Sequence, residues 1–106
     1  MELKDYREQL DKIDESMVKL FSQRMEIVGQ IAEYKKENGL PVLDEERERE
    51  KLVAISQMSP EAAREYAVSL YSLIFELSRS SQNRVLGLTT ALTDQIKNAI
   101  ENTPPL

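Results

Sequence analysis

Residues 3–34 read LKDYREQLDKIDESMVKLFSQRMEIVGQIAEY, and the predicted architecture of the whole chain follows from this segment. Apolar residues recur in it at intervals of three and four, and we call them the apolar seam: Leu3, Tyr6, Leu10, Ile13, Met17, Leu20, Ile27, Ile31 and Tyr34. The spacing predicts an amphipathic helix close to the heptad repeat of a coiled coil. Between Leu20 and Ile27, where the pattern needs an apolar residue, the sequence has Arg24. Because a buried unpaired charge is very costly, Arg24 must either extend to solvent or meet an anion.

The length of this helix predicts a dimer. A helix of about 35 residues is roughly 50 Å long, whereas a compact domain of this size has a diameter of only about 35 Å. Helical patterns beyond about 25 residues usually belong to coiled coils, repeats or membrane spans. Charges in every turn exclude a membrane span. The helix would therefore extend out of a monomer, and we expect a second copy of the chain to cover the apolar seam.

Composition limits the class of protein. With 106 residues the chain has room for one small domain, and 41% hydrophobic and 31% charged residues are typical of a soluble helical protein. A net charge of -5 argues against sequence-independent nucleic-acid binding. No segment resembles a signal peptide or a membrane anchor, and cysteine is absent. We therefore expect a cytoplasmic protein.

The chain contains neither histidine nor cysteine. It therefore has no thiol nucleophile, no imidazole base and no zinc site of the usual ligand types. A magnesium site made of carboxylates alone stays open. If the protein is an enzyme, we expect no metal and no cofactor, and a reaction that depends on binding and electrostatics more than on proton transfer.

The first two helices have clear boundary signals. Residues 1–5 are expected to be a frayed lead-in, and the first helix should end at Gly39 as a left-handed cap, with Pro41 just beyond. Asp44 is a good N-cap for a second helix that runs to about Gln57.

A third helix is predicted to open at Ser59, followed by proline and an acidic residue. Its apolar stripe comprises Tyr66, Leu70, Leu73, Ile74, Leu77, Val85, Leu88 and Leu92. We expect its end anywhere from Gly87 to Asn102. The sequence thus predicts an all-α fold of three helices, long, short and long, as one domain over residues 1–102. Residues 103–106 form a linker-like tail.

Three cations on the first helix are candidate anion ligands. Arg24 and Lys35 are eleven residues apart, or three helical turns, so they point within roughly 20° of each other. Surface helices often carry such pairs by chance, and the position of Arg24 in the apolar seam is what distinguishes this one. Arg7 is about 25 Å from Arg24 along the same helix, so one small ligand could touch both only across a crossed or antiparallel dimer. A surface arginine paired with a neighbouring acid is the alternative for Arg7.

Polar groups on the other two helices complete the candidate set. Asp44, Arg47 and Glu48 share a face at the start of the second helix and could hold a hydroxylated ligand. Capping plus an intrahelical ion pair is the alternative for these three. Ser78 and Gln82 are one turn apart where the third helix's stripe turns polar, although serines in long helices also ease close packing. Together these groups suit a small organic polyanion that bears hydroxyl groups.

Over residues 1 to about 90 the chain resembles the all-helical chorismate mutases, found alone or as the leading domain of bifunctional prephenate dehydratases. The resemblance rests on several short motifs: Tyr6-Arg7-Glu8, Ile13-Asp14, Gln23-Arg24, Lys35, Pro41-Val42, Asp44, Arg47-Glu48, Ser78 and Gln82. It implies an intertwined homodimer of three-helix chains with two shared active sites. It also implies the intramolecular [3,3] rearrangement of chorismate to prephenate in phenylalanine and tyrosine biosynthesis.

The resemblance also implies a role for each candidate residue. Arg24 and Arg7 of the partner subunit would bind the two carboxylates of chorismate, supported by Ser78 and Arg47. Lys35 and Gln82 would hydrogen-bond the ether oxygen. Glu48 and the region of Asp44 would hold the ring hydroxyl.

Two other functions stay open. One is a non-catalytic helical dimerisation or regulatory module, in which the cations form surface pairs. The other is an isochorismate pyruvate lyase on the same scaffold. The sequence also leaves open whether the native chain continues into a prephenate dehydratase domain, and it gives no information on allosteric control.

Overall fold

The computed structural model describes residues 1–87 and 98–101, and in this part of the chain it is all-α. The elements are α1 (Leu3–Asn38), α2 (Glu45–Met58), a 3-10 turn η1 (Glu61–Ala63) and α3 (Arg64–Val85). Residues 98–101 are also helical. The predicted all-α class with a long, a short and a long helix is confirmed. None of the helices in the described part of the chain contains an apolar stretch of the length that a membrane span requires.

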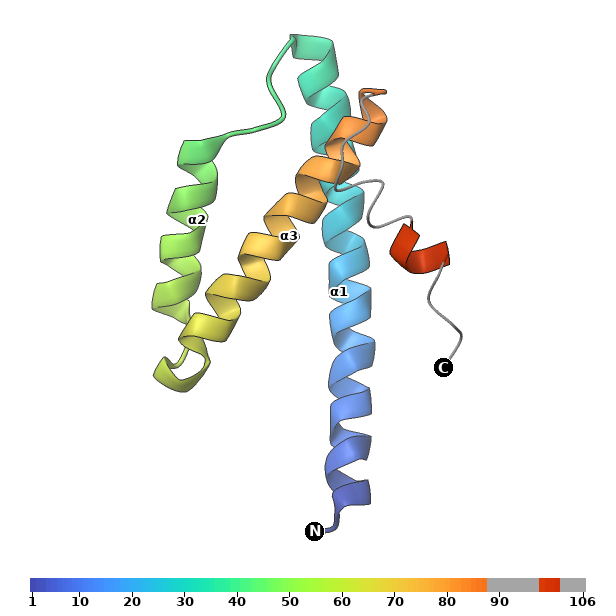
Figure 1. The fold of residues 1–106 in the computed structure, drawn as a ribbon, viewed down its shortest axis with the longest axis vertical. Coiled ribbons are helices and arrows are strands. Elements are labelled where there is room, and N and C mark those ends of the chain that lie inside the picture. The colour runs from blue at the N-terminus through green and yellow to red at the C-terminus, as the bar shows by residue number, and fades with distance from the viewer. Residues whose placement is uncertain (88–97, 102–106) are drawn as a thin grey trace.

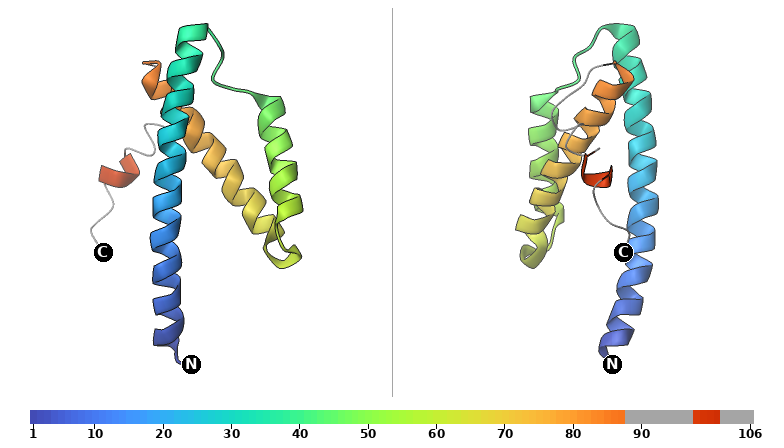
Figure 2. Two further views of the ribbon diagram at one scale, coloured as in Figure 1. Left: turned by 180° about the vertical axis from the view of Figure 1, so that it is seen from behind. Right: turned by 45° about the vertical axis from the view of Figure 1, so that its right-hand side comes forward.

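The helices form an open arrangement with a projecting arm. α2 and α3 form a hairpin, and α3 crosses the C-terminal half of α1 (Figures 1 and 2). α3 packs against both α1 and α2. The N-terminal half of α1 extends away from the hairpin, and the molecule measures 54 × 37 × 21 Å. The radius of gyration of 16.5 Å exceeds the value of about 13 Å for a compact domain of this length, as the predicted long helix requires.

The ends of α1 follow from local hydrogen bonds. At its C-terminus Gly39 has φ 63°, and its N–H bonds the Lys35 carbonyl, so the predicted left-handed cap is confirmed. The predicted frayed lead-in over residues 1–5 is wrong, because α1 already begins at Leu3. There the Glu2 backbone N–H donates to the Asp5 carboxylate at 2.8 Å, completing a capping box that stabilises the first turn.

The connections on either side of α3 also differ from the prediction. Ser59 does not cap α3; its hydroxyl donates to the Ile55 carbonyl at 2.6 Å, which ends α2 instead. α3 starts at Arg64, after η1. It ends at Val85, slightly before the predicted range, and Gly87 follows with φ 75°. The predicted tail 103–106 lies outside the described residues.

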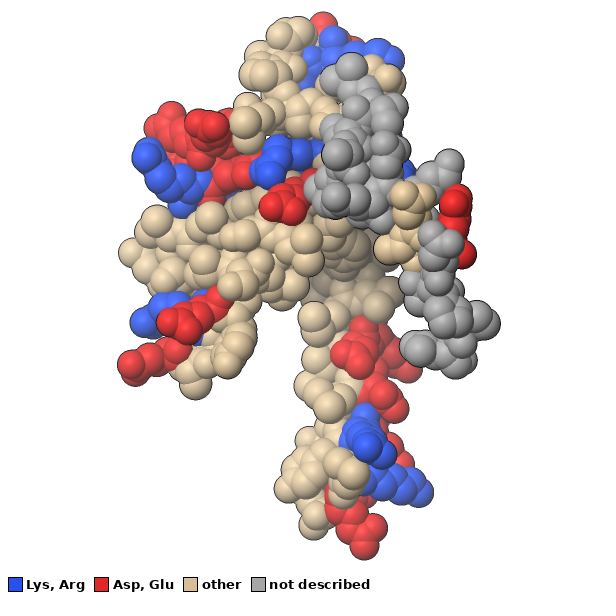
Figure 3. All heavy atoms as spheres, in the orientation of Figure 1, with Lys and Arg blue, Asp and Glu red and all other residues tan. Residues whose placement is uncertain are grey.

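The core of a single chain is small, and the apolar seam lies outside it. The buried apolar side chains of the described residues are Val28, Ala32, Ile55 and Phe75. All nine residues of the apolar seam are 43–63% exposed. In Figure 3 the projecting part of α1 carries its charged groups on one side and uncharged atoms on the other. The chain alone thus leaves a long apolar surface uncovered.

Candidate active site

The three helices line a cavity of about 430 Å³ that is open to solvent on one side and contains both apolar and charged side chains. Seven of the eight residues predicted from the sequence line it: Arg24, Lys35, Asp44, Arg47, Glu48, Ser78 and Gln82. Its remaining lining residues are Val28, Ile31, Val42, Lys51, Phe75 and Arg79. Five of the lining side chains are cationic and two are acidic. The cavity therefore favours an anionic ligand even though the whole chain has a net charge of -5.

Arg24 is half-buried and points across the α1–α3 contact. Its Nη1 donates to the Ser78 hydroxyl at 2.7 Å, and its guanidinium carbon lies 5.7 Å from the centroid of the Phe75 ring. The Ser78 hydroxyl itself donates to the Ile74 carbonyl at 2.7 Å, which fixes its lone pairs toward the arginine. Neither contact neutralises the guanidinium. The position therefore holds a preoriented cation whose counter-charge can come from a ligand.

Lys35 lies on the same face of α1 and joins the helix to two other segments. Its Nζ donates to the Val42 carbonyl at 2.7 Å and to Gln82 Oε1 at 3.0 Å. Gln82 is only 7% exposed, and because its oxygen accepts from Lys35, its Nε2 is the group available as a donor. A charged and a neutral donor thus meet at one end of the cavity.

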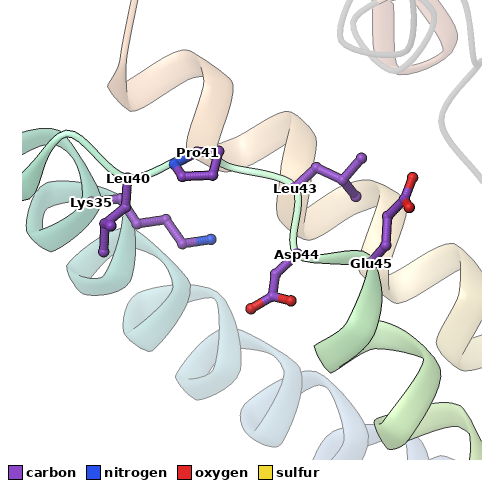
Figure 4. Close-up of a pocket in the computed structure, with 6 residues that line it drawn as sticks. All are labelled: Lys35, Leu40, Pro41, Leu43, Asp44 and Glu45. Atoms are coloured by element: carbon purple, nitrogen blue, oxygen red, sulfur yellow. The ribbon is translucent and has the colours of Figure 1, made fainter.

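The start of α2 forms the opposite wall. Asp44 caps the helix by accepting from the Arg47 backbone N–H at 3.0 Å, so the predicted N-cap is confirmed. Figure 4 shows Lys35 and Asp44 extending toward the same space beneath the loop between α1 and α2. Glu48 forms an ion pair with Arg79 of α3, in place of the intrahelical pair that was the alternative for this residue.

Arg7 is the one candidate that the chain does not bring to the cavity. It lies near the N-terminus of the projecting arm and is exposed. Seventeen residues of helix separate it from Arg24, about 25 Å. Within one chain it cannot share a small ligand with the other candidates.

Sequence reasoning missed Phe75 and Arg79. Phe75, Ser78 and Gln82 are spaced by three and four residues, so a buried strip runs beside the apolar stripe of α3. That spacing was the available signal for Phe75. Arg79 directly follows Ser78 and faces α2, and only the angle between the helices reveals its partner.

Metal ligands do not gather in the described part of the chain: no group of three His, Cys, Asp or Glu side chains there could hold an ion.

Comparison with known proteins decides the family, since residues 6–83 match chorismate mutase type II. The chain belongs to this family. The resemblance inferred from the sequence is thereby confirmed, and the all-α structure agrees with it.

Three curated relatives are much longer than the segment that they share with this chain. The T-protein of Haemophilus influenzae is 41% identical over 46 residues, which cover 43% of this chain and 12% of the relative. The bifunctional chorismate mutase/prephenate dehydratase of Buchnera aphidicola from Acyrthosiphon pisum is 32% identical over 83 residues. These cover 76% of this chain and 22% of the relative. The protein of the same name from Aquifex aeolicus is 30% identical over 89 residues, which cover 79% of this chain and 25% of the relative. The chain thus spans a quarter or less of these relatives, and it matches no solved structure.

Proposed function

We propose that the protein is a chorismate mutase, an isomerase that converts chorismate to prephenate by an intramolecular [3,3] rearrangement. The observation that carries the proposal is the convergence of Arg24, Lys35, Ser78 and Gln82 on the same cavity, through two cross-helix hydrogen bonds. Family membership supports the same reaction. So does the absence of histidine and cysteine, because the rearrangement needs no acid, base or nucleophile.

The first task of such a site is to hold a flexible dianion with its reacting carbons close together. Arg24 is the principal carboxylate ligand, since Ser78 and the Phe75 ring already fix its guanidinium. Arg47 adds charge from α2. Holding the ligand in a reactive conformation removes the entropic part of the barrier before the chemical step.

The second task is to stabilise the negative charge that grows on the ether oxygen as its bond to the ring breaks. The ammonium of Lys35 and the amide of Gln82 are the donors for this oxygen. Their mutual hydrogen bond and the bond to Val42 hold them in place without substrate, so little reorganisation is needed during the reaction. Glu48 and the region of Asp44 accept from the ring hydroxyl at the other wall.

The site is completed in a homodimer. The apolar seam is 43–63% exposed in one chain, and its burial by a second copy would remove a large apolar area from water. An intertwined pairing would also bring Arg7 of the partner subunit to the second carboxylate. The domain proposed for this role spans residues 1–102.

The two rival functions predict different outcomes in one assay. Purified protein is incubated with chorismate and, separately, with isochorismate, and the products are identified by chromatography. We expect prephenate from chorismate. Salicylate and pyruvate from isochorismate, with no prephenate, would indicate the lyase. No turnover of either substrate, and no binding of a chorismate-like dianion in a titration, would indicate a non-catalytic dimerisation module.

A further inference from the structure

We infer that Arg79 is a positioning residue that holds the Glu48 carboxylate in place for the ring hydroxyl of the substrate; this inference rests on the proposed function and deepens it. Arg79 Nη1 on α3 donates to Glu48 Oε1 on α2. Both side chains line the cavity that contains Arg24 and Lys35. The pair thus joins two walls of the site at the position of its carboxylate.

The choice of partner indicates a role in the site. Glu48 has Lys51 nearly one turn ahead on its own helix, in the spacing of an ordinary intrahelical pair, and yet the ion pair it forms is with Arg79. The two side chains remain 30% and 25% exposed. Ion pairs this accessible to solvent contribute little to stability. A purely structural pair is therefore a poor explanation for an arginine at the cavity wall.

The geometry explains what Arg79 would do. Glu48 has three rotatable side-chain bonds, and in a cavity with five cations it has several competing partners. The bond from Arg79 occupies Oε1 and leaves Oε2 to accept from a substrate hydroxyl. Without Arg79 the Glu48 carboxylate could turn toward Lys51 or Arg47. The Glu48 side chain would then have to lose rotational freedom when it forms its hydrogen bond to the substrate. Arg79 therefore acts through Glu48 on the orientation of the substrate ring.

The test compares Arg79→Met, which keeps much of the side-chain volume and removes the charge, with Arg79→Lys. Arg84→Met is the matched control, since Arg84 lies on the same helix but is exposed and outside the cavity lining. For Arg79→Met we expect kcat/KM for chorismate to fall about 10-fold, the size of a lost hydrogen bond to a charged group. Arg79→Lys should recover part of that loss, because the charge remains but the planar fork does not. Arg84→Met should match the parent protein.

Two further measurements separate positioning from direct contact with the substrate. In a Glu48→Gln background, Arg79→Met should change kcat/KM by less than about twofold, because the group it acts through is gone. With a chorismate analogue that lacks the ring hydroxyl, Arg79→Met and the parent protein should likewise agree within about twofold. An undiminished penalty in either experiment would overturn the inference and would indicate that Arg79 touches the substrate itself.

The remaining outcomes are also decisive. Parent-like turnover by Arg79→Met, in a protein that converts chorismate, overturns the role of Arg79 and leaves the proposed function standing. A parent protein with no turnover of chorismate overturns both. The far-ultraviolet circular dichroism of each variant is compared with that of the parent. If Arg79→Met does not fold, the same comparisons are made with Arg79→Gln, which also removes the charge and for which an unchanged kcat/KM would contradict the inference.

Discussion

Lys35→Ala is the substitution that most sharply separates catalysis from folding in this site. The Lys35 ammonium makes two hydrogen bonds, at 2.7 Å to the Val42 carbonyl and at 3.0 Å to Gln82. In the proposed reaction the same group faces the ether oxygen on which charge develops. Removing one donor of this kind typically lowers the rate by about 10²–10³. We therefore expect kcat to fall more than about 100-fold.

The same substitution should change stability much less. Lys35 is half-buried and also lines a second, open pocket under the loop between α1 and α2, from which water can replace its hydrogen bonds. The loss should be about 1.5–3 kcal/mol of unfolding free energy, the usual range for hydrogen bonds to a charged group. The helix itself should persist, since alanine has the highest helix propensity.

The assay follows chorismate loss in a spectrophotometer, with thermal unfolding of the same samples by circular dichroism. Lys36→Ala is the control, because Lys36 is the next residue of α1 and is exposed. It should retain the activity of the parent protein. A Lys35→Ala variant with turnover within threefold of the parent would remove Lys35 from the mechanism and would refute the electrostatic argument.

Two other predictions concern the fold and the dimer. Gly39→Ala should lower the unfolding free energy by about 1 kcal/mol. A residue with a Cβ is strained at φ 63°, although no neighbouring atom would clash with the added Cβ. An unchanged unfolding curve would show that this position does not require glycine. Leu10→Asp places a charge in the apolar seam, where Leu10 is 55% exposed in the single chain. The variant should sediment as a monomer in place of a dimer and should lose activity, because the charge would be buried in the proposed interface. A dimer that persists with full activity would contradict that interface.

Local chemistry made much of the fold predictable. Gly39 and Asp44 end and begin helices through their own backbone and side-chain geometry, so the sequence alone was sufficient to place them. The heptad-like spacing likewise predicted a helix too long for a compact monomer, and α1 has 36 residues. The boundary errors arose where two local signals compete. Ser59 can cap either neighbouring helix, and the Glu2–Asp5 capping box resembles an ordinary acidic N-terminus in the sequence.

The candidate site was predictable where its residues repeat with the helix period. Arg24 and Lys35 share one face of α1, and Ser78 and Gln82 share one face of α3, so their convergence needed only that the two faces meet. The pairing of Glu48 with Arg79 depends on how α2 crosses α3, which no local spacing encodes. Arg7 stays a prediction, because its place in the site depends on a second chain.

We propose that two copies of the chain build each site, and subunit complementation is the decisive experiment. Arg7→Ala and Arg24→Ala are each expected to be inactive alone. In a mixed dimer, one site then has both native arginines and the other has neither. Co-refolding equal amounts should restore about a quarter of the parent activity, since half of randomly paired dimers are mixed and each has one intact site of two. Verified mixed dimers with no activity above that of the separate variants would contradict a site shared between subunits.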